Sequence, residues 1–138
     1  MADVNESVIQ YHKSPAHVGA LEYAVDFIVP EGTPVVAAAE GVIADIQLDS
    51  DRGGSAKEFE PLGNFIEIEH DHGEYSEYEH LRKDGVAVRV GQRVVRGQVI
   101  GYSGATGWLA HLGSHLHFMV GTYGTADEYK TLEIQWAN

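Results

Sequence analysis

The string Ser114-His115-Leu116-His117-Phe118 holds the residues best suited to chemistry. On a β-strand, side chains two residues apart point to the same face and lie roughly 6.6 Å apart. His115 and His117 therefore face the same way if this string is a strand. One imidazole can then bind a metal ion while the other reaches the activated water, or both can bind the metal. A surface or hydrogen-bonded pair without a catalytic role is the alternative.

The choice of further ligands is narrow because the chain of 138 residues has no cysteine. Disulfides and thiolate ligands are excluded, so a metal ion must bind to His, Asp and Glu. A catalytic zinc ion takes about three protein ligands and keeps one position open. The candidates that could join the histidine pair are His12, His17, Glu22 and Asp26 upstream, and His70, His72 and His80 in the middle of the chain.

Short β-strands would have to position these residues. In the stretch 64–70, apolar and polar residues alternate, so Ile66, Ile68 and His70 share one face. His70 is therefore expected to be buried and hydrogen-bonded. Glycines bound most of the other strands, which we predict at 35–39, 42–48, 75–81, 86–90, 94–95, 98–102, 115–120 and 131–136. Residues 50–62 are expected to form an exposed loop. The pattern indicates a single domain over 1–138, all-β and mainly antiparallel, with few or no helices.

Charge and hydropathy exclude several classes of partner. The chain has 9 basic and 21 acidic residues and a formal net charge of −12, which disfavours nucleic acid and anionic lipid as general partners. The apolar stretches are too short to span a bilayer. No signal peptide is present in the chain as written, so either a leader was removed or the protein acts in the cytoplasm. No pattern indicates an oligomeric state.

The segment from His17 to Val35, H-V-G-A-L-E-Y-A-V-D-F-I-V-P-E-G-T-P-V, resembles the opening motif of the lysostaphin-type (LytM-like) zinc metallopeptidases. In that family of peptidoglycan endopeptidases, a His, a Gly and an Asp precede a P-x-G-T-P-V turn. The resemblance continues in register to Val120, through the segments 35–42, 63–70, 78–81, 91–101, 104–107 and 115–118. It implies the duplicated hybrid motif of antiparallel sheets, with the motif-bearing core at about 12–120.

Position by position, the resemblance implies that Asp26 and His117 bind one zinc ion per chain. His80 and His115 would be the two catalytic histidines that do not bind the metal. The third ligand departs from the family pattern, because Glu22 stands where many relatives have a His. The H-x-G signature begins instead at His17, and we expect His17 rather than Glu22 to be the third ligand. Residues 108–114, which include His111, form a longer and more apolar loop than in most relatives.

The implied function is a zinc-dependent metalloendopeptidase that hydrolyses peptide bonds in peptidoglycan cross-bridges or stem peptides by means of a metal-activated water. Peptidoglycan peptides would be its partners, and the family location is periplasmic or extracellular. One alternative is a catalytically inactive homologue that regulates or activates cell-wall hydrolases. The string 94–101 also resembles the turns of biotinyl and lipoyl carrier domains, but no lysine of this chain stands at the expected hairpin tip.

Overall fold

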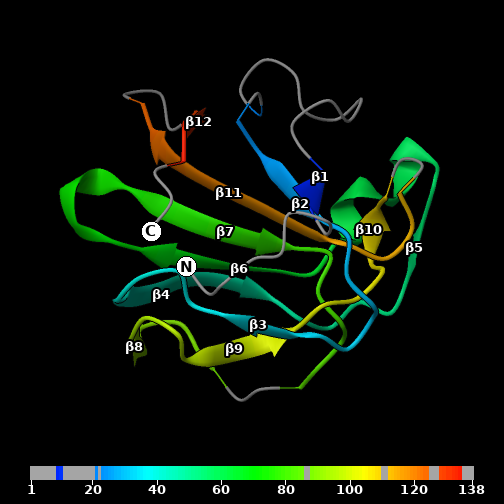
Figure 1. Ribbon diagram of the computed structural model, residues 1–138, viewed down its shortest axis with the longest axis horizontal. Coiled ribbons are helices and arrows are strands. Elements are labelled where there is room, and N and C mark those ends of the chain that lie inside the picture. Colours follow the sequence, from blue (N-terminus) through cyan, green and yellow to red (C-terminus); the bar gives the residue numbers. More distant parts are fainter. Residues whose placement is uncertain are drawn as a thin grey trace.

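The computed structural model describes residues 9–10, 21, 23–85, 88–109, 112–124 and 128–134. Its main element is an eight-stranded sheet in which neighbouring strands are antiparallel (Figure 1). The strands lie in the order β1-β2-β11-β7-β6-β4-β8, and β12 also pairs with β11. Their bounds are β1 Ile9–Gln10, β2 Val25–Phe27, β4 Gly41–Gln47, β6 Phe65–Glu69, β7 Tyr75–Glu79, β8 Arg93–Val94, β11 Leu116–Tyr123 and β12 Tyr129–Leu132.

Two small sheets accompany the main one. Strands β3 (Pro34–Val36) and β9 (Val99–Tyr102) pair antiparallel and lie beside β4 in Figure 1. Strands β5 (Gly53–Gly54) and β10 (Gly107–Trp108) form a short parallel pair near the start of β11. The described helices are the 3₁₀ segments η3 (Lys57–Leu62) and η4 (Asp71–Gly73). The predicted all-β, mainly antiparallel fold is confirmed.

The alternation in β6 sets the two faces of the main sheet. Ile66 and Ile68 are fully buried and belong to a core cluster whose residues come from the main sheet and from the small sheet of β3 and β9. Strands β6 and β7 form an antiparallel hairpin, and His72 turns the chain there with φ = 66°. The core residues are Val25, Phe27, Val35, Ala37, Ile43, Ile66, Ile68, Tyr78, Leu81, Val94, Ile100 and Phe118.

Two strand predictions and one loop prediction differ from the structure. Residues 88–90 are not in a strand, and 86–87 lie outside the described residues. The last strand is β12, which ends at Leu132 rather than reaching residue 136. The predicted loop 50–62 contains β5 and η3, because local backbone hydrogen bonds such as Phe59 N–H to Ala56 O close the 3₁₀ turns. None of the helices in the described part of the chain is long and apolar enough to cross a membrane.

Candidate catalytic and metal site

Asp26 and His117 face each other on neighbouring strands. They are directly opposed in the pairing of β2 with β11. Their neighbours Val25 and Phe118 point into the core, so the Asp26 and His117 side chains lie on the opposite face of the sheet. The distance from Asp26 Oδ1 to His117 Nδ1 is 3.1 Å, and both residues are at most 5% exposed. The strand register therefore brings together two metal-binding groups that are 91 residues apart in sequence.

This pair fits two corners of a zinc site. Zinc accepts carboxylate oxygen and imidazole nitrogen at about 2.0–2.2 Å, so two donors of a tetrahedral site lie roughly 3.3 Å apart. The observed 3.1 Å between Asp26 Oδ1 and His117 Nδ1 is close to that separation. Among the described residues, no three His, Asp or Glu side chains are arranged so that they could hold a metal ion together. The expected third ligand, His17, and its alternative, Glu22, both lie outside the described residues.

His115 reaches the same carboxylate from the residue before β11. Its Nε2 lies 3.6 Å from Asp26 Oδ1, so His115 and His117 share a face as the strand spacing predicts. Its Nδ1 lies 2.7 Å from the carbonyl oxygen of Gly113. A carbonyl only accepts hydrogen bonds, so Nδ1 carries a proton and donates it. This hydrogen bond orients Nε2 toward Asp26.

His80 joins the cluster through an unusual backbone conformation. On a continuous strand, His80 would point away from the face of Glu79, but its φ of 67° lies in the left-handed region, which is strained for most residues. Its ring centroid then lies 4.5 Å from that of His115 and 5.8 Å from that of His117. Its Nδ1–H donates to the Thr106 carbonyl at 2.7 Å. Burial and the neighbouring histidines lower the pKa of His80 to about 3, so its imidazole is neutral near pH 7.

Carboxylates surround the other side of His117. Burial lowers the pKa of His117, but Glu79, Asp26 and Glu77 outweigh burial and the pKa is raised overall. Burial, followed by repulsion from Glu79 and Glu67, raises the pKa of the Glu77 carboxyl to about 8. Neither Glu77 nor Glu79 is among the residues predicted from the sequence. Their position opposite Met119 and His117 follows from the register of β7 with β11, which no local motif specifies.

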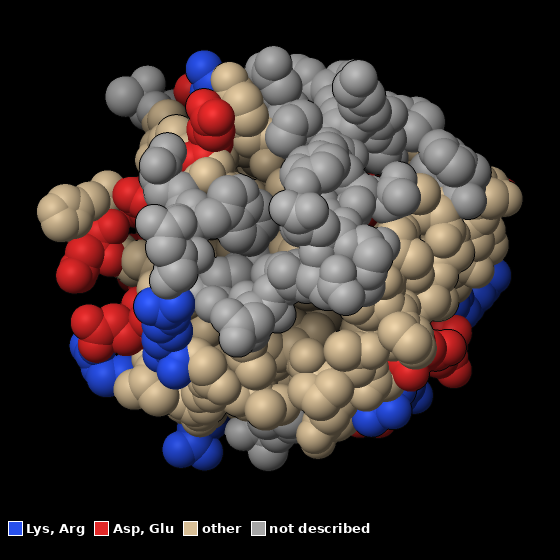
Figure 2. All heavy atoms as spheres, in the orientation of Figure 1, with Lys and Arg blue, Asp and Glu red and all other residues tan. Residues whose placement is uncertain are grey.

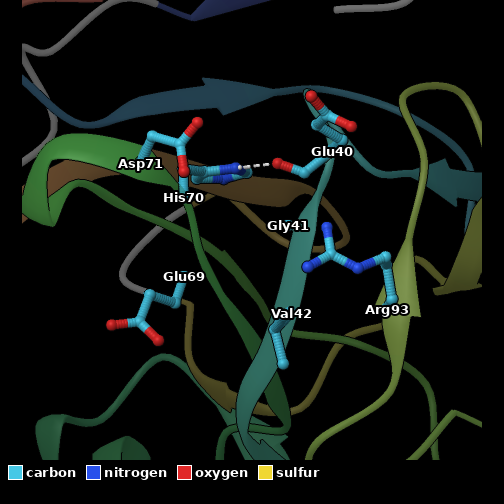
Figure 3. A pocket seen from close by; sticks show the side chains of 7 residues that line it. All are labelled: Glu40, Gly41, Val42, Glu69, His70, Asp71 and Arg93. Carbon is cyan, nitrogen blue, oxygen red and sulfur yellow. Dashed lines mark hydrogen bonds between the residues drawn. The ribbon is translucent and has the colours of Figure 1, made fainter.

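The other histidines that the structure describes, His70 and His72, do not join this cluster. His70 is hydrogen-bonded as expected: Nδ1 lies 2.7 Å from the Glu40 carbonyl oxygen and Nε2 lies 2.7 Å from Ser76 Oγ. It is half-buried and lines a separate pocket of about 240 Å³ between β4, β6 and β8, into which Arg93 projects (Figure 3). Figure 2 shows acidic and basic side chains side by side along this edge of the molecule. His72 is exposed, and His12 and His111 lie outside the described residues.

The 50–62 segment packs against Trp108, and the residue before it, Gly107, lies next to His80. Trp108, at the start of the predicted long loop, donates its indole N–H to the Ser55 carbonyl at 3.2 Å. The Lys57 ammonium lies 5.7 Å from the Trp108 ring centroid. Gly107 lies closely between the 50–62 segment and His80. A Cβ on Gly107 would lie 2.6 Å from Gly63 Cα and 3.3 Å from His80 Nδ1.

Gly107→Ala is expected to lower the free energy of unfolding by about 2–4 kcal/mol, because it combines a backbone clash with strain at φ = 85°. Gly113→Ala is the matched control, since Gly113 also has a positive φ, of 67°, but a Cβ there would meet no atom of the described residues within 4 Å. We expect a loss of only about 1 kcal/mol there. Urea unfolding of both variants measures the difference. Equal losses of unfolding free energy in the two variants would show that the close contact between Gly107 and Gly63 does not contribute to stability.

Comparison with known proteins agrees with this geometry. The model of Peptidase family M23 matches residues 20–128. The peptidoglycan DD-endopeptidase ShyC of Vibrio cholerae is 33% identical over 112 residues, which cover 81% of this chain and 23% of that protein. Lysostaphin of Staphylococcus simulans is 38% identical over 100 residues, which cover 72% of this chain and 18% of that protein. The chain thus spans about a fifth of the length of these relatives.

Solved structures show the same fold. The catalytic domain of lysostaphin from Staphylococcus simulans superimposes with a TM-score of 0.60 at 29% identity, over 89% of this chain and 86% of that one. A zinc-containing peptidase from Vibrio cholerae superimposes with a TM-score of 0.59 at 28% identity, over 96% of this chain and 36% of that one.

Proposed function

This chain belongs to peptidase family M23, and we propose that it is a zinc-dependent metalloendopeptidase that hydrolyses peptide bonds in peptidoglycan cross-bridges or stem peptides. The observation that carries the proposal is the convergence of one buried carboxylate and three buried imidazoles, from Asp26, His80, His115 and His117. The similarity to peptidoglycan endopeptidases supports the substrate class.

Asp26 and His117 would hold the zinc ion through Oδ1 and Nδ1, together with His17. When bound, zinc polarises the scissile carbonyl and lowers the pKa of water at its open position to about 7. The set of two histidines and one aspartate leaves a net charge of +1, which suits anionic intermediates. The buried Asp26 carboxylate and the His117 ring, whose Nδ1 faces it, are the donor types that this ion accepts.

His80 and His115 would carry out the proton transfers. Each donates Nδ1–H to a backbone carbonyl, so in the neutral ring Nε2 has the lone pair that accepts a proton. One imidazole would accept the proton of the attacking water, and the other would stabilise the oxyanion or donate a proton to the leaving amine. Each role typically contributes on the order of 10² to 10⁴ in rate. The low pKa of His80 keeps its ring neutral at the start of the cycle.

The retained cluster weighs against an inactive homologue that only regulates other hydrolases, since all four expected residues are present and buried together.

We also propose that residues 1–138 form one domain and that the protein acts in the periplasm or outside the cell. Fractionation of the host cells tests the location, and recovery of the protein in the cytoplasmic fraction alone would contradict it.

Metal content and peptide-bond cleavage test the proposed function together. Purified protein should contain about one zinc ion per chain, and its digest of purified peptidoglycan should yield peptide fragments with new amino termini by mass spectrometry. Treatment with a chelator should stop the release of fragments, and added zinc should restore it. Zinc-loaded protein that releases no peptide fragment from any peptidoglycan chemotype would contradict the proposal.

The third ligand gives a separate prediction. His17→Ala is expected to weaken zinc binding by more than about tenfold, because the site loses one of its three protein ligands. Glu22→Ala should retain most of its zinc and activity. A site built on Glu22 would be formally neutral and would lower the pKa of the bound water less. Chelator competition on both variants measures the ranking, and a larger loss in Glu22→Ala would identify Glu22 as the ligand.

A further inference from the structure

The second ring nitrogen of His117 faces two side chains, those of Met119 and Glu79, to which the sequence motifs assign no role. His117 Nε2 lies 3.4 Å from the sulfur of Met119 and 4.0 Å from Oε2 of Glu79. Glu79 is the residue directly opposite His117 in the pairing of β7 with β11, and directly opposed residues have side chains on the same face. The contact is therefore fixed by the sheet itself and does not depend on a loop.

Both ring nitrogens of His117 face atoms that accept hydrogen bonds: the Asp26 carboxylate at Nδ1, and the Met119 thioether and the Glu79 carboxylate at Nε2. A histidine binds a metal ion through a deprotonated ring nitrogen. Binding through Nδ1, the atom that lies 3.1 Å from Asp26 Oδ1, therefore leaves the proton on Nε2, where it points toward Met119 and Glu79. Met119 is the nearer acceptor. At 4.0 Å the Glu79 carboxylate is beyond hydrogen-bond distance and acts on the N–H through its charge.

We propose that Glu79 is a positioning residue of the metal site: its carboxylate, with the Met119 thioether, holds the Nε2–H of His117 and thereby directs Nδ1 toward the metal. This inference rests on the proposed function. A carboxylate behind a metal-binding histidine fixes the ring orientation and makes the ligand nitrogen more basic. The His117 side chain is only 6% exposed, and charges interact more strongly in such a poorly solvated site than in water.

A second role for Glu79 has to be separated from positioning. The side chain of Glu79 is 30% exposed, so a direct contact with the substrate is the competing role. A positioning residue changes the affinity for zinc in the absence of substrate, whereas a substrate contact changes KM and leaves the zinc affinity unchanged.

Zinc affinity of the full chain, measured by competition with a chromophoric chelator, separates these roles. Glu79→Ala should weaken zinc binding by about 10-fold to 100-fold. Glu79→Gln keeps an acceptor oxygen without the charge and should fall between wild type and Glu79→Ala. Met119→Leu removes only the sulfur and should lose less affinity than Glu79→Ala. Glu69→Ala is the control. In the pairing of β6 with β7, Glu67 lies opposite Glu77 and Glu69 lies opposite Tyr75, so Glu69 is an exposed carboxylate on the same face of the sheet as Glu79 but farther along it.

Two further readouts accompany the affinities. The visible absorption bands of the Co²⁺-substituted protein should shift in Glu79→Ala, because the orientation of His117 changes, and should stay unchanged in Glu69→Ala. At saturating zinc, KM of Glu79→Ala should equal that of wild type. Equal zinc affinities of wild type and a folded Glu79→Ala variant would overturn the inference alone, whatever happens to KM. A wild-type protein that binds no zinc would overturn the proposed function and, with it, this inference.

Discussion

Replacing His117 with Ala is expected to abolish both stoichiometric zinc binding and peptidoglycan hydrolysis. The substitution removes one of the two donors that the register of β2 and β11 brings to 3.1 Å, and a zinc ion left with two protein ligands binds poorly. Asp26→Ala should have the same effect. Metal content after gel filtration, followed by digestion of purified peptidoglycan, measures both losses.

Folding has to be separated from metal binding in these variants. His117→Ala removes the imidazole that lies 3.1 Å from the buried Asp26 carboxylate. Removing one partner of a buried ion pair lowers the free energy of unfolding by about 3–5 kcal/mol. Circular dichroism shows whether each variant remains folded. His72→Asn is the control for the loss of a histidine, since His72 is exposed at φ = 66° and Asn tolerates that conformation. Full zinc occupancy in a folded His117→Ala variant would exclude His117 as a ligand.

Replacing His80 or His115 should separate catalysis from metal binding. His115→Ala is expected to keep its zinc while kcat falls by roughly 10² to 10⁴, because one proton-transfer group is lost. For His80 the better variant is Asn, because the backbone there has φ = 67° and Ala would add strain to the loss of the imidazole. His80→Asn should show a similar fall in kcat.

The outcome that would contradict these roles is loss of zinc. If either folded variant loses its metal, a ligand and a catalytic residue have been exchanged in our assignment. If both keep zinc and full kcat, neither histidine takes part in proton transfer. The double variant adds a check, since residues that act in one step show non-additive losses.

The fold was predictable where a side-chain pattern has a short period. Alternation over 64–70 predicted a strand with Ile66 and Ile68 on one face, and both are fully buried. The spacing of His115 and His117 predicted a shared face, and both rings approach the Asp26 carboxylate. Family resemblance, rather than any local pattern, pointed to Asp26 and His80.

Other features depend on the pairing of distant strands, which a local pattern does not encode. Glu79 faces His117 because β7 and β11 pair in one register, and a shift by one residue would place it on the other face. The left-handed conformation of His80 also follows from its tertiary setting, where the Thr106 carbonyl accepts its Nδ1–H. All of η3 was predicted as loop because the segment 50–62 is rich in Gly and charge.

Anomalous scattering at the zinc edge from crystals of the zinc-loaded protein tests the central claim most directly. One peak per chain is expected at about 2.0–2.2 Å from a carboxylate oxygen of Asp26 and from Nδ1 of His117, with His17 as the third protein ligand. His80 and His115 should lie near the ion without binding it. A peak at another site, or a bond to zinc through Nε2 of His117, would contradict the account.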